Sequence, residues 1–498
     1  MTRNYLDILA ESIRNNWNQP ALTDFYLTDD GKAQDTSRGN HYTYGEMYAE
    51  IVCIADFLTQ LGLQKGDHIA ICGANSAHWA IAYLAIAKMQ GVSVTVMHSL
   101  QPEEQAHLID FSDAKALFVD SEIWKELYRP VLDNLSSVIA LDDWSVLRGE
   151  NISLPYREES EVGFPFVDLD NLAMICFTSG TTECPKGVML SYINVDGNVV
   201  SALSTYPDDK NEHAIALFPF CHMLSIVCEV LAQLIMGKLI NIVRNPLTYI
   251  TIVQGLLIIR PYAFCGVSII LRKLYEQYYP VLNSYMTRTC KLILVGGSPM
   301  PIEIEKEIIS KGWPLAIGYG QTETGGCISL SNSIFHKKGS CGKVTKELQY
   351  KNVKNEICVK GTKVMLGYYK DPEATAQKID KDGWLHTGDR GHLDEDGYLY
   401  VEGRLEQDMI VLPNGENIRP DNIESLINAL PEVSESIVLA RDGKLVAIVV
   451  PKEPIDRKDI LRAINPQLPL FSQLYDVEIT DQALARTEKQ TLKRYLYK

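Results

Sequence analysis

The sequence lacks paired cysteines, and this absence narrows the class of protein. Its 498 residues include 11 cysteines, an odd total, and they occur singly with no Cys-x-x-Cys pair. A structural zinc site typically uses closely spaced pairs of cysteines, and a disulfide framework typically uses an even number of them. The pattern therefore predicts a cytoplasmic protein with reduced thiols.

Long apolar runs are also lacking. The two most apolar stretches, 214–240 and 256–271, fall short of the roughly 20 clean residues that a membrane span needs. They are interrupted by Pro219, His222, Glu229, Arg260 and Pro261. The first 25 residues alternate acidic and apolar side chains at helical spacing, unlike the continuous apolar region of a signal peptide. We predict an N-terminal surface helix and no transmembrane segment.

Positive charge is in deficit. The chain has 47 Lys+Arg against 63 Asp+Glu, a net charge of −16, which repels nucleic acid and anionic membrane surfaces. Hydrophobic residues make up 46% and charged residues 22%, as in soluble globular proteins. The composition excludes fibrous and mostly disordered proteins, and it predicts no nucleic-acid partner. The length predicts about three domains or subdomains.

From about residue 40, short β-rich runs alternate with helical segments. Residues 42–62 and 78–91 are typical of helices, whereas 68–74 and 92–97 are typical of strands. Such alternation predicts an α/β protein whose body has two α/β lobes with parallel sheets. After about residue 330, short alternating strands with glycine turns predict a small β subdomain. The last 95 residues or so predict a separate α+β unit.

The strongest local signal is the segment ICFTSGTTECPKGVMLS, residues 175–191. A β run leads into a turn rich in hydroxyl groups and followed by a lysine, which suits a polyphosphate. The residues are Thr178, Ser179, Gly180, Thr181, Thr182 and Lys186. It is not a Walker A loop, because Pro185 and Gly187 stand where that motif needs Gly and Ser or Thr. A Ser/Thr-rich turn without a ligand is the alternative.

This segment resembles the signature of the adenylate-forming superfamily, which includes acyl-CoA synthetases, luciferases and the adenylation domains of peptide synthetases. Six further blocks resemble that family in the same order, so the likeness covers essentially the whole chain. They are FPFCHMLS (218–225), GGSPMP (296–301), GYGQTET (318–324), GYYKDPEATA (367–376), GWLHTGDRGHLDEDGYLYVEGR (383–404) and NGENIRPDNIE (414–424).

The resemblance implies a binding site for MgATP. Glycines let the backbone approach a flat ligand, and an aromatic ring offers a stacking face. The implied nucleotide-binding residues in these blocks are Gly296, Gly297, Ser298, Gly318, Tyr319, Gly320 and Gln321, with Thr322 near the α-phosphate. Glu323 and Thr178 are the implied ligands of Mg²⁺, a cation that prefers oxygen. A solvated loop acid is the alternative for Glu323.

Two residues further along the chain are implied at the ribose. A carboxylate such as Asp389 can accept hydrogen bonds from two neighbouring hydroxyls at once. Arg404 is the companion position, near the ribose and α-phosphate. The two residues could instead form an ordinary exposed ion pair.

The block FPFCHMLS is implied at the pocket for the carboxylic acid. The family places an aromatic residue or His at the position of His222, although a lone His among apolar residues is often a satisfied core residue. Phe220, Gly266 and Val267 could line an aliphatic tunnel, or belong to ordinary packing. No acid occurs in residues 218–227 to pair with a substrate ammonium, which favours an acid without an α-amine.

Three positions depart from the family pattern. Glu183 replaces a usual Gly and adds negative charge beside the phosphate turn. The hinge segment carries one additional residue, with Asp408 as the hinge acid. Thr491 stands where most of the family has the lysine that drives adenylation, and we expect Lys489 or Lys493 to replace it.

The resemblance is strongest to bacterial long-chain fatty acyl-CoA synthetases. It predicts a ligase that activates a carboxylic acid, expected to be a fatty acid, as acyl-AMP and transfers it to CoA. ATP, Mg²⁺ and CoA are the implied cofactors, and the locally basic tail 486–498 suits the phosphates of CoA. The predicted domains are 1–403, a hinge at 404–408 and 409–498, in a monomer or homodimer. Alternatives are an acyl carrier protein as acceptor, release of the acyl-AMP, or a binding protein that has lost catalysis.

Overall fold

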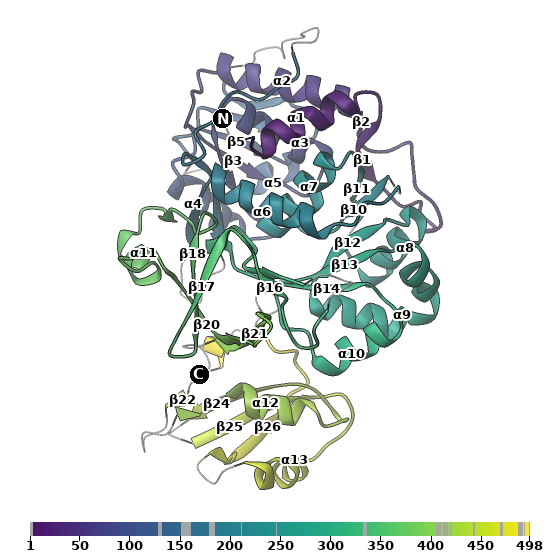
Figure 1. Ribbon diagram of the computed structural model, residues 1–498, viewed down its shortest axis with the longest axis vertical. Coiled ribbons are helices and arrows are strands. Elements are labelled where there is room, and N and C mark those ends of the chain that lie inside the picture. The colour runs from purple at the N-terminus through teal and green to yellow at the C-terminus, as the bar shows by residue number, and fades with distance from the viewer. Residues whose placement is uncertain are drawn as a thin grey trace. The chain divides into compact units, whose positions relative to one another are not determined.

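The computed structural model has a mixed α/β architecture, which confirms the predicted fold class (Figure 1). It describes residues 3–127, 132–150, 161–178, 185–210, 212–245, 247–331, 336–404, 410–411, 417–418, 420–441, 444–468, 472–486, 492 and 494–497. The chain divides into two compact units. Unit 1 comprises Met1–Lys351, Cys358–Thr387 and Leu393–Tyr400, and unit 2 comprises Asn352–Ile357, Gly388–His392 and Val401–Lys498.

The first lobe of unit 1 is an eight-stranded sheet in the order β19-β9-β8-β4-β3-β5-β6-β7. Its strands are β3 (His68–Cys72), β4 (Val92–Thr95), β5 (Ala116–Val119), β6 (Ser137–Ala140), β7 (Val146–Arg148), β8 (Leu172–Thr178), β9 (Lys186–Ser191) and β19 (Gly367–Tyr368). The central pairs are parallel, as β3 with β4 and β5 shows. Both faces of parallel strands are covered, which explains their continuous apolar runs.

Five helices accompany the strands of this lobe, and the first two lie close to the predicted ranges 42–62 and 78–91. They are α2 (Tyr44–Gln60), α3 (Ala77–Lys88), α4 (Pro102–Phe111), α5 (Ser121–Glu126) and α6 (Tyr192–Thr205). Thr43 caps α2 by accepting a hydrogen bond from Glu46 N, and Glu46 reaches back to the cap. Such a capping box stops the helix from starting earlier in the sequence.

The remaining body of unit 1 contains a four-stranded sheet, β10-β11-β1-β2, and a five-stranded sheet, β12-β13-β14-β15-β16. The first consists of β1 (Pro20–Phe25), β2 (His41–Thr43), β10 (His213–Ala216) and β11 (Leu239–Val243). The second consists of β12 (Ala263–Gly266), β13 (Leu292–Val295), β14 (Leu315–Tyr319), β15 (Ser329–Leu330) and β16 (Lys343–Val344). Strands β12, β13 and β14 are parallel.

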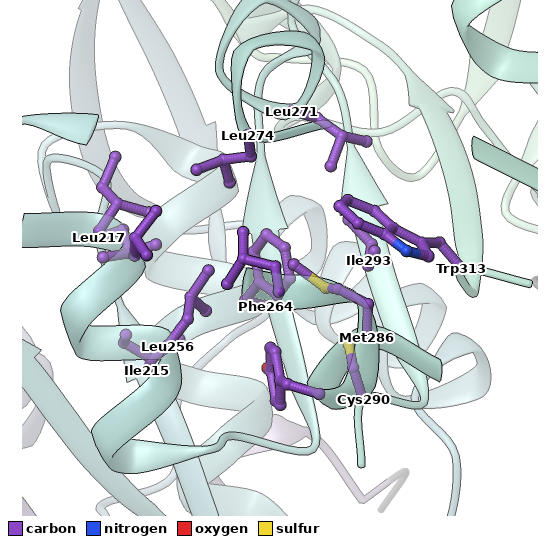
Figure 2. Packing of buried hydrophobic residues seen from close by; sticks show 14 of the residues in the cluster. Ile215, Leu217, Leu256, Phe264, Leu271, Leu274, Met286, Cys290, Ile293 and Trp313 are labelled. Atoms are coloured by element: carbon purple, nitrogen blue, oxygen red, sulfur yellow. The ribbon is translucent and has the colours of Figure 1, made fainter. Parts of the chain in front are cut away.

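A shared apolar core joins these sheets to their helices (Figure 2). Phe264, Leu256, Leu274 and Ile293 come from different elements and pack within it. The helices of this region are α1 (Tyr5–Asn15), α7 (Ala232–Ile235), α8 (Tyr249–Ile259), α9 (Ser268–Arg288) and α10 (Ile302–Ser310), with a π-helix, η2 (Ser225–Leu231), and a 3₁₀ turn, η3 (Thr322–Thr324). Burial of these side chains fixes the strand ends that precede the candidate site.

The N-terminal prediction needs a correction. The helix is present as α1, but Tyr5, Leu9 and Ile13 are buried, so one face belongs to the core. Residues 20–25 form strand β1 instead of helix, because they pair in parallel with β11. In the part of the chain that the structure describes, no helix combines the length and apolarity needed to cross a bilayer.

The predicted β subdomain is a four-stranded sheet of order β17-β18-β20-β21. Its elements are β17 (Leu348–Val353), β18 (Glu356–Gly361), β20 (Leu385–Leu393) and β21 (Leu399–Arg404), with helix α11 (Pro372–Lys378) nearby in the chain. One of the predicted glycine turns lies between β20 and β21, where Gly397 has a φ of 80° and its N–H donates to Asp394 O. Glycine suits that positive φ.

The C-terminal part of unit 2 has its own α+β core. Its sheets are β22-β23 and β24-β25-β26. The elements are β22 (Ile410–Val411), β23 (Asn417–Ile418), α12 (Pro420–Asn428), β24 (Val433–Arg441), β25 (Lys444–Pro451), α13 (Arg457–Ile464), η4 (Asn465–Gln467), β26 (Asp476–Ile479) and η6 (Arg494–Leu496). Ile423, Ile427, Ala447 and Ile460 pack together in this core. The hinge at 404–408 stays a prediction, since residues 405–409 lie outside the described residues.

Candidate active site

Three parallel strands of unit 1 end at one edge of their sheet, and predicted site residues lie at or directly after the end of each. Gly266 ends β12, Gly296, Gly297 and Ser298 follow β13, and Gly318 lies in β14. Gly296 N donates to Gly266 O at 3.1 Å. Ser298 O accepts from the Ser268 hydroxyl at 2.8 Å, one residue after Val267. The carboxyl ends of parallel strands are where open α/β sheets bind ligands.

The loop after β14 is shaped by close backbone contacts. A Cβ on Gly320 would lie 2.2 Å from Gly326 O, so only glycine fits there without a shift. Tyr319 and Thr322 are half-buried. The Gln321 side-chain amide donates to Thr387 O at 3.3 Å, which joins this loop to the HTGD block. Two of the family-like blocks therefore meet within unit 1.

Glu323 is the candidate metal ligand, and a residue that the sequence did not single out holds it. The Tyr368 hydroxyl donates to Glu323 Oε1 at 2.8 Å. Met365 N donates to the Glu323 backbone carbonyl at 2.9 Å. Within the described part of the chain, no donor contacts the other carboxylate oxygen, Oε2. A half-buried carboxylate with one held oxygen and one available oxygen fits Mg²⁺, which takes oxygen ligands.

Tyr368 reaches Glu323 because its strand, β19, pairs with β9 of the phosphate-loop hairpin. Tyr368 lies opposite Val188 in the antiparallel register. The Lys186 ammonium, at the start of β9, stands 5.0 Å from the centre of the Tyr368 ring. A cation over an aromatic face is attracted to it. The sequence marked Tyr368 only as a member of the block GYYKDPEATA, because its partner Glu323 lies 45 positions away in the chain.

The predicted phosphate loop is described at its two ends. Thr178 and Lys186 pair across the β8–β9 hairpin, and the Thr178 hydroxyl donates to Lys186 O at 3.5 Å. Ser179, Gly180, Thr181, Thr182 and Glu183 lie outside the described residues. Thr178 and Lys186 are thus the loop residues that the structure places.

The predicted acid-pocket residues occupy different environments. Phe220 is buried against Trp79, with ring centroids 5.5 Å apart, and its N–H donates to Asn75 Oδ1 at 2.8 Å. His222 is half-buried, and its carbonyl accepts from Ser225 N at 3.0 Å where the π-helix η2 begins. Phe220 therefore packs toward helix α3. The pocket roles of both residues stay predictions.

Glu229, in the middle of η2, is a buried acid that belongs to none of the predicted site residues. Its carboxyl group accepts from Leu217 N and Phe218 N, each at 3.2 Å. Burial raises the pKa of Glu229 to about 8, although these backbone hydrogen bonds oppose the shift. An acid inside an otherwise apolar run was the available signal. A π-turn of this kind is rare and often lies at functional sites.

The predicted ribose residues belong to unit 2. Asp389 is buried on β20, and Gly388 N, directly before it, donates to Glu356 Oε1 at 2.9 Å. Arg404 ends β21. Convergence of Asp389 with Thr178 on one nucleotide stays a prediction.

Two arginines of the predicted basic tail are paired with acids, and the tail's role toward CoA stays a prediction. The Arg494 guanidinium is bound to Glu424 at 2.5 Å and to Asp421 at 3.0 Å. Arg486 is bound to Glu435 at 2.5 Å. These two cations are therefore neutralised within unit 2. Lys489, Thr491, Lys493 and Asp408 lie outside the described residues, so their roles stay predictions.

A family model and several curated proteins match most of this chain. The family model described as AMP-binding enzyme matches residues 9–369. The putative acyl-CoA synthetase YngI of Bacillus subtilis strain 168 is 29% identical over 467 residues, covering 82% of this chain and 81% of that protein. The 4-coumarate–CoA ligase 3 of Arabidopsis thaliana is 27% identical over 493 residues, covering 89% and 83%.

Among solved structures, o-succinylbenzoate CoA synthetase (MenE) of Bacillus subtilis in complex with the acyl-adenylate intermediate OSB-AMP resembles this chain with a TM-score of 0.81. The two chains are 24% identical, and the match covers 100% of this chain and 98% of that one. A likeness at this identity shows the fold.

Proposed function

This chain belongs to the family of AMP-binding enzymes, and from that membership we propose that it is a ligase that joins a carboxylic acid to CoA at the expense of ATP. The observation that carries the proposal is the half-buried Glu323 carboxylate, held by Tyr368 beside the cation of Lys186. The loop after β14 carries Glu323, and glycines also lie at the ends of β12 and β13 in the same sheet. This combination suits a phosphate-bearing nucleotide with its divalent cation.

In the first half-reaction, a carboxylate oxygen of the acid attacks the α-phosphorus of ATP. The bond from that phosphorus to the bridging oxygen breaks, and pyrophosphate leaves with the electron pair, giving acyl-AMP. Glu323 and Thr178 would hold Mg²⁺, which supplies charge neutralisation at the phosphates. Lys186 contributes a fixed positive charge, and the loop 318–322 orients the nucleotide.

In the second half-reaction, the sulfur of CoA attacks the acyl carbon and AMP leaves, so a thioester forms and the thiol proton goes to solvent. The proposal assigns the adenylation lysine to Lys489 or Lys493, the hinge to Asp408 and the ribose contacts to Asp389 and Arg404. A hinge would let one chain serve both half-reactions in turn.

We propose a fatty acid as the substrate. The π-helix η2 is buried throughout, and Ser225 and Glu229 are the polar residues among its apolar side chains. The carboxyl group of Glu229 is already occupied by two backbone N–H groups, and its raised pKa disfavours the charged form at neutral pH. It is therefore a poor partner for a substrate ammonium, which supports an acid without an α-amine. The relative that acts on 4-coumarate motivates aromatic acids as competitors.

The acid and the acceptor can be identified in one assay series. Purified protein with ATP and Mg²⁺ is given saturated fatty acids of graded length, 4-coumarate or an α-amino acid, and pyrophosphate release is measured. CoA is then compared with a holo carrier protein as thiol acceptor. We expect fatty acids to be preferred and CoA to be acylated.

Glu323→Gln should lower the rate of pyrophosphate release by about 10²–10³, because charge stabilisation at the phosphates is lost. Glu276→Gln, which removes an exposed acid on α9, is the matched control and should retain the wild-type rate. ATP binding without pyrophosphate release for any acid would contradict the ligase assignment and favour a nucleotide-binding protein without catalysis.

A further inference from the structure

Lys363 is a fully buried lysine that contacts the loop carrying Glu323. Its side chain has 0% exposure. The ammonium donates to Ser201 Oγ at 2.6 Å, to Thr345 Oγ1 at 2.9 Å and to Cys327 O at 3.4 Å. The Glu347 carboxylate lies 3.5 Å away. All three ammonium donors therefore have an acceptor, which a buried cation requires.

Helix α6 leaves space for the side chain of Lys363. A Cβ on Gly197 would lie 3.2 Å from Lys363 Cγ, so the absence of a side chain there makes room for the aliphatic stem. One turn earlier, the Asn194 amide donates to Thr362 O at 2.7 Å and to Val364 O at 3.0 Å. Both peptide neighbours of Lys363 are thus attached to the same helix.

The segment fixed in this way supplies both hydrogen bonds to Glu323. Met365, two residues after Lys363, donates its N–H to the Glu323 backbone carbonyl. Tyr368, five residues after Lys363, donates its hydroxyl to Glu323 Oε1. Displacement of residues 362–365 would therefore move the backbone and the carboxylate of Glu323 together.

Lys363 also contacts the other arm of the Glu323 loop. The carbonyl of Cys327 that it binds lies four residues after Glu323. Asn198 of α6 holds the same arm, because it accepts from Cys327 N at 3.0 Å and donates to Thr324 O at 3.0 Å. One buried ammonium thus joins the two segments that flank the candidate metal ligand.

We propose that Lys363 is a positioning residue for Glu323, which sets the geometry of the Mg²⁺ ligand without touching substrate or metal. The inference rests on the proposed function in that Glu323 is taken as the ligand of Mg²⁺. Partners of metal ligands fix ligand orientation and strongly affect metal affinity. Stability alone gives no reason for the charge, because a well-packed apolar side chain of similar size is commonly as stabilising as a buried ion pair.

The test measures Mg²⁺-dependent ATP binding, which needs no acid and no turnover. Thermal unfolding is followed at fixed ATP while Mg²⁺ is titrated, and the Mg²⁺ concentration at half of the ATP-induced shift is recorded. Lys363→Met should raise that concentration roughly tenfold. Tyr368→Phe, which removes the direct donor to Glu323, should shift it in the same direction.

Lys238→Met is the matched control. Lys238 is also buried, donates to Asp209 O at 2.6 Å and lies 4.7 Å from the centre of the Tyr262 ring. Its substitution should leave the Mg²⁺ midpoint at the wild-type value, even where the unfolding temperature falls. A Lys363→Met protein with lowered stability and an unchanged Mg²⁺ midpoint would overturn the inference.

Three further outcomes also bear on the inference. If Lys363→Met does not fold, Thr345→Val removes one acceptor of the ammonium, and a raised midpoint supports the inference whereas an unchanged one overturns it. If wild-type protein shows no Mg²⁺-dependent shift with ATP, the inference is wrong. If it shows the shift but releases no pyrophosphate with any acid, the ligase proposal fails while the comparison of Lys363→Met with wild type still decides the role of Lys363.

Discussion

At the residue scale, the chemistry of Glu229 is set by its surroundings. Its carboxyl group is buried, accepts two backbone N–H groups and has a pKa of about 8, against 4.5 for an ordinary glutamic acid. In the unfolded chain the group ionises near the ordinary value. Between these two pKa values the folded protein holds the proton that the unfolded protein has lost.

Glu229 therefore makes folding pH-dependent. Its contribution to the free energy of unfolding is complete below about pH 4.5 and is lost as the pH rises to about 8. Glu229→Gln keeps one acceptor oxygen and removes the titration. Between pH 5.5 and 8.5, the free energy of unfolding should therefore fall less in the variant than in the wild type, by a few kcal/mol. Urea unfolding of both proteins at the two pH values checks this. Parallel pH dependences would show that Glu229 is already ionised in the folded state.

At the element scale, α9 carries a proline in its interior. Pro280 is exposed and lies within the helix Ser268–Arg288, whose buried face includes Leu271, Leu274 and Leu282. Proline has no N–H to donate to the carbonyl four residues earlier, and its ring crowds that carbonyl. The helix therefore persists because its apolar face packs into the core of Figure 2, not because its sequence favours helix throughout.

Replacement of this proline should stabilise the protein. Pro280→Ala restores one backbone hydrogen bond and should raise the free energy of unfolding by about 2 kcal/mol, after allowance for the more flexible unfolded chain. Chemical denaturation measures the change. Ser284→Ala, another exposed position of the same helix, is the control and should change stability by less than about 0.5 kcal/mol. A destabilised Pro280→Ala protein would mean that a bend at this proline is required by the packing.

At the scale of the whole molecule, the two units have separate apolar cores. Ile293 on β13 is fully buried in unit 1, and Ile460 on α13 is fully buried in unit 2. Of the candidate site residues, Thr178, Lys186, Tyr319 and Glu323 belong to unit 1, whereas Asp389 belongs to unit 2. Because the cores are separate, stability can be perturbed in one unit at a time.

Ile460→Ala and Ile293→Ala should each cost about 2–5 kcal/mol, since each leaves a cavity in a packed core. Differential scanning calorimetry should show two transitions, with each variant lowering a different one. In the Ile460→Ala protein, MgATP should still raise the midpoint temperature of the unit 1 transition, which is the transition that Ile293→Ala lowers. A single transition lowered equally by both variants would contradict independent cores.

Local patterns in the sequence anticipated most of the architecture. Residues 42–62 and 78–91 were predicted as helices and appear as α2 and α3, because their apolar periodicity and caps are local properties. The strand β1 was missed, since Pro20–Phe25 lies between β2 and β11 in its sheet, and β11 is more than 200 residues away in the chain. The π-helix η2 was likewise not predictable from an apolar run alone.

The sequence by itself determined the kinds of residue available: a hydroxyl-rich turn before Lys186, glycines where the backbone must come close, and Glu323 in a polar loop. These follow from side-chain chemistry and from the conformations each residue can adopt. Tertiary structure alone decided that Tyr368 holds Glu323, that Lys363 is buried behind it and that Glu229 keeps its proton. The physical reason is that hydrogen-bond partners and desolvation depend on which distant segments pack together.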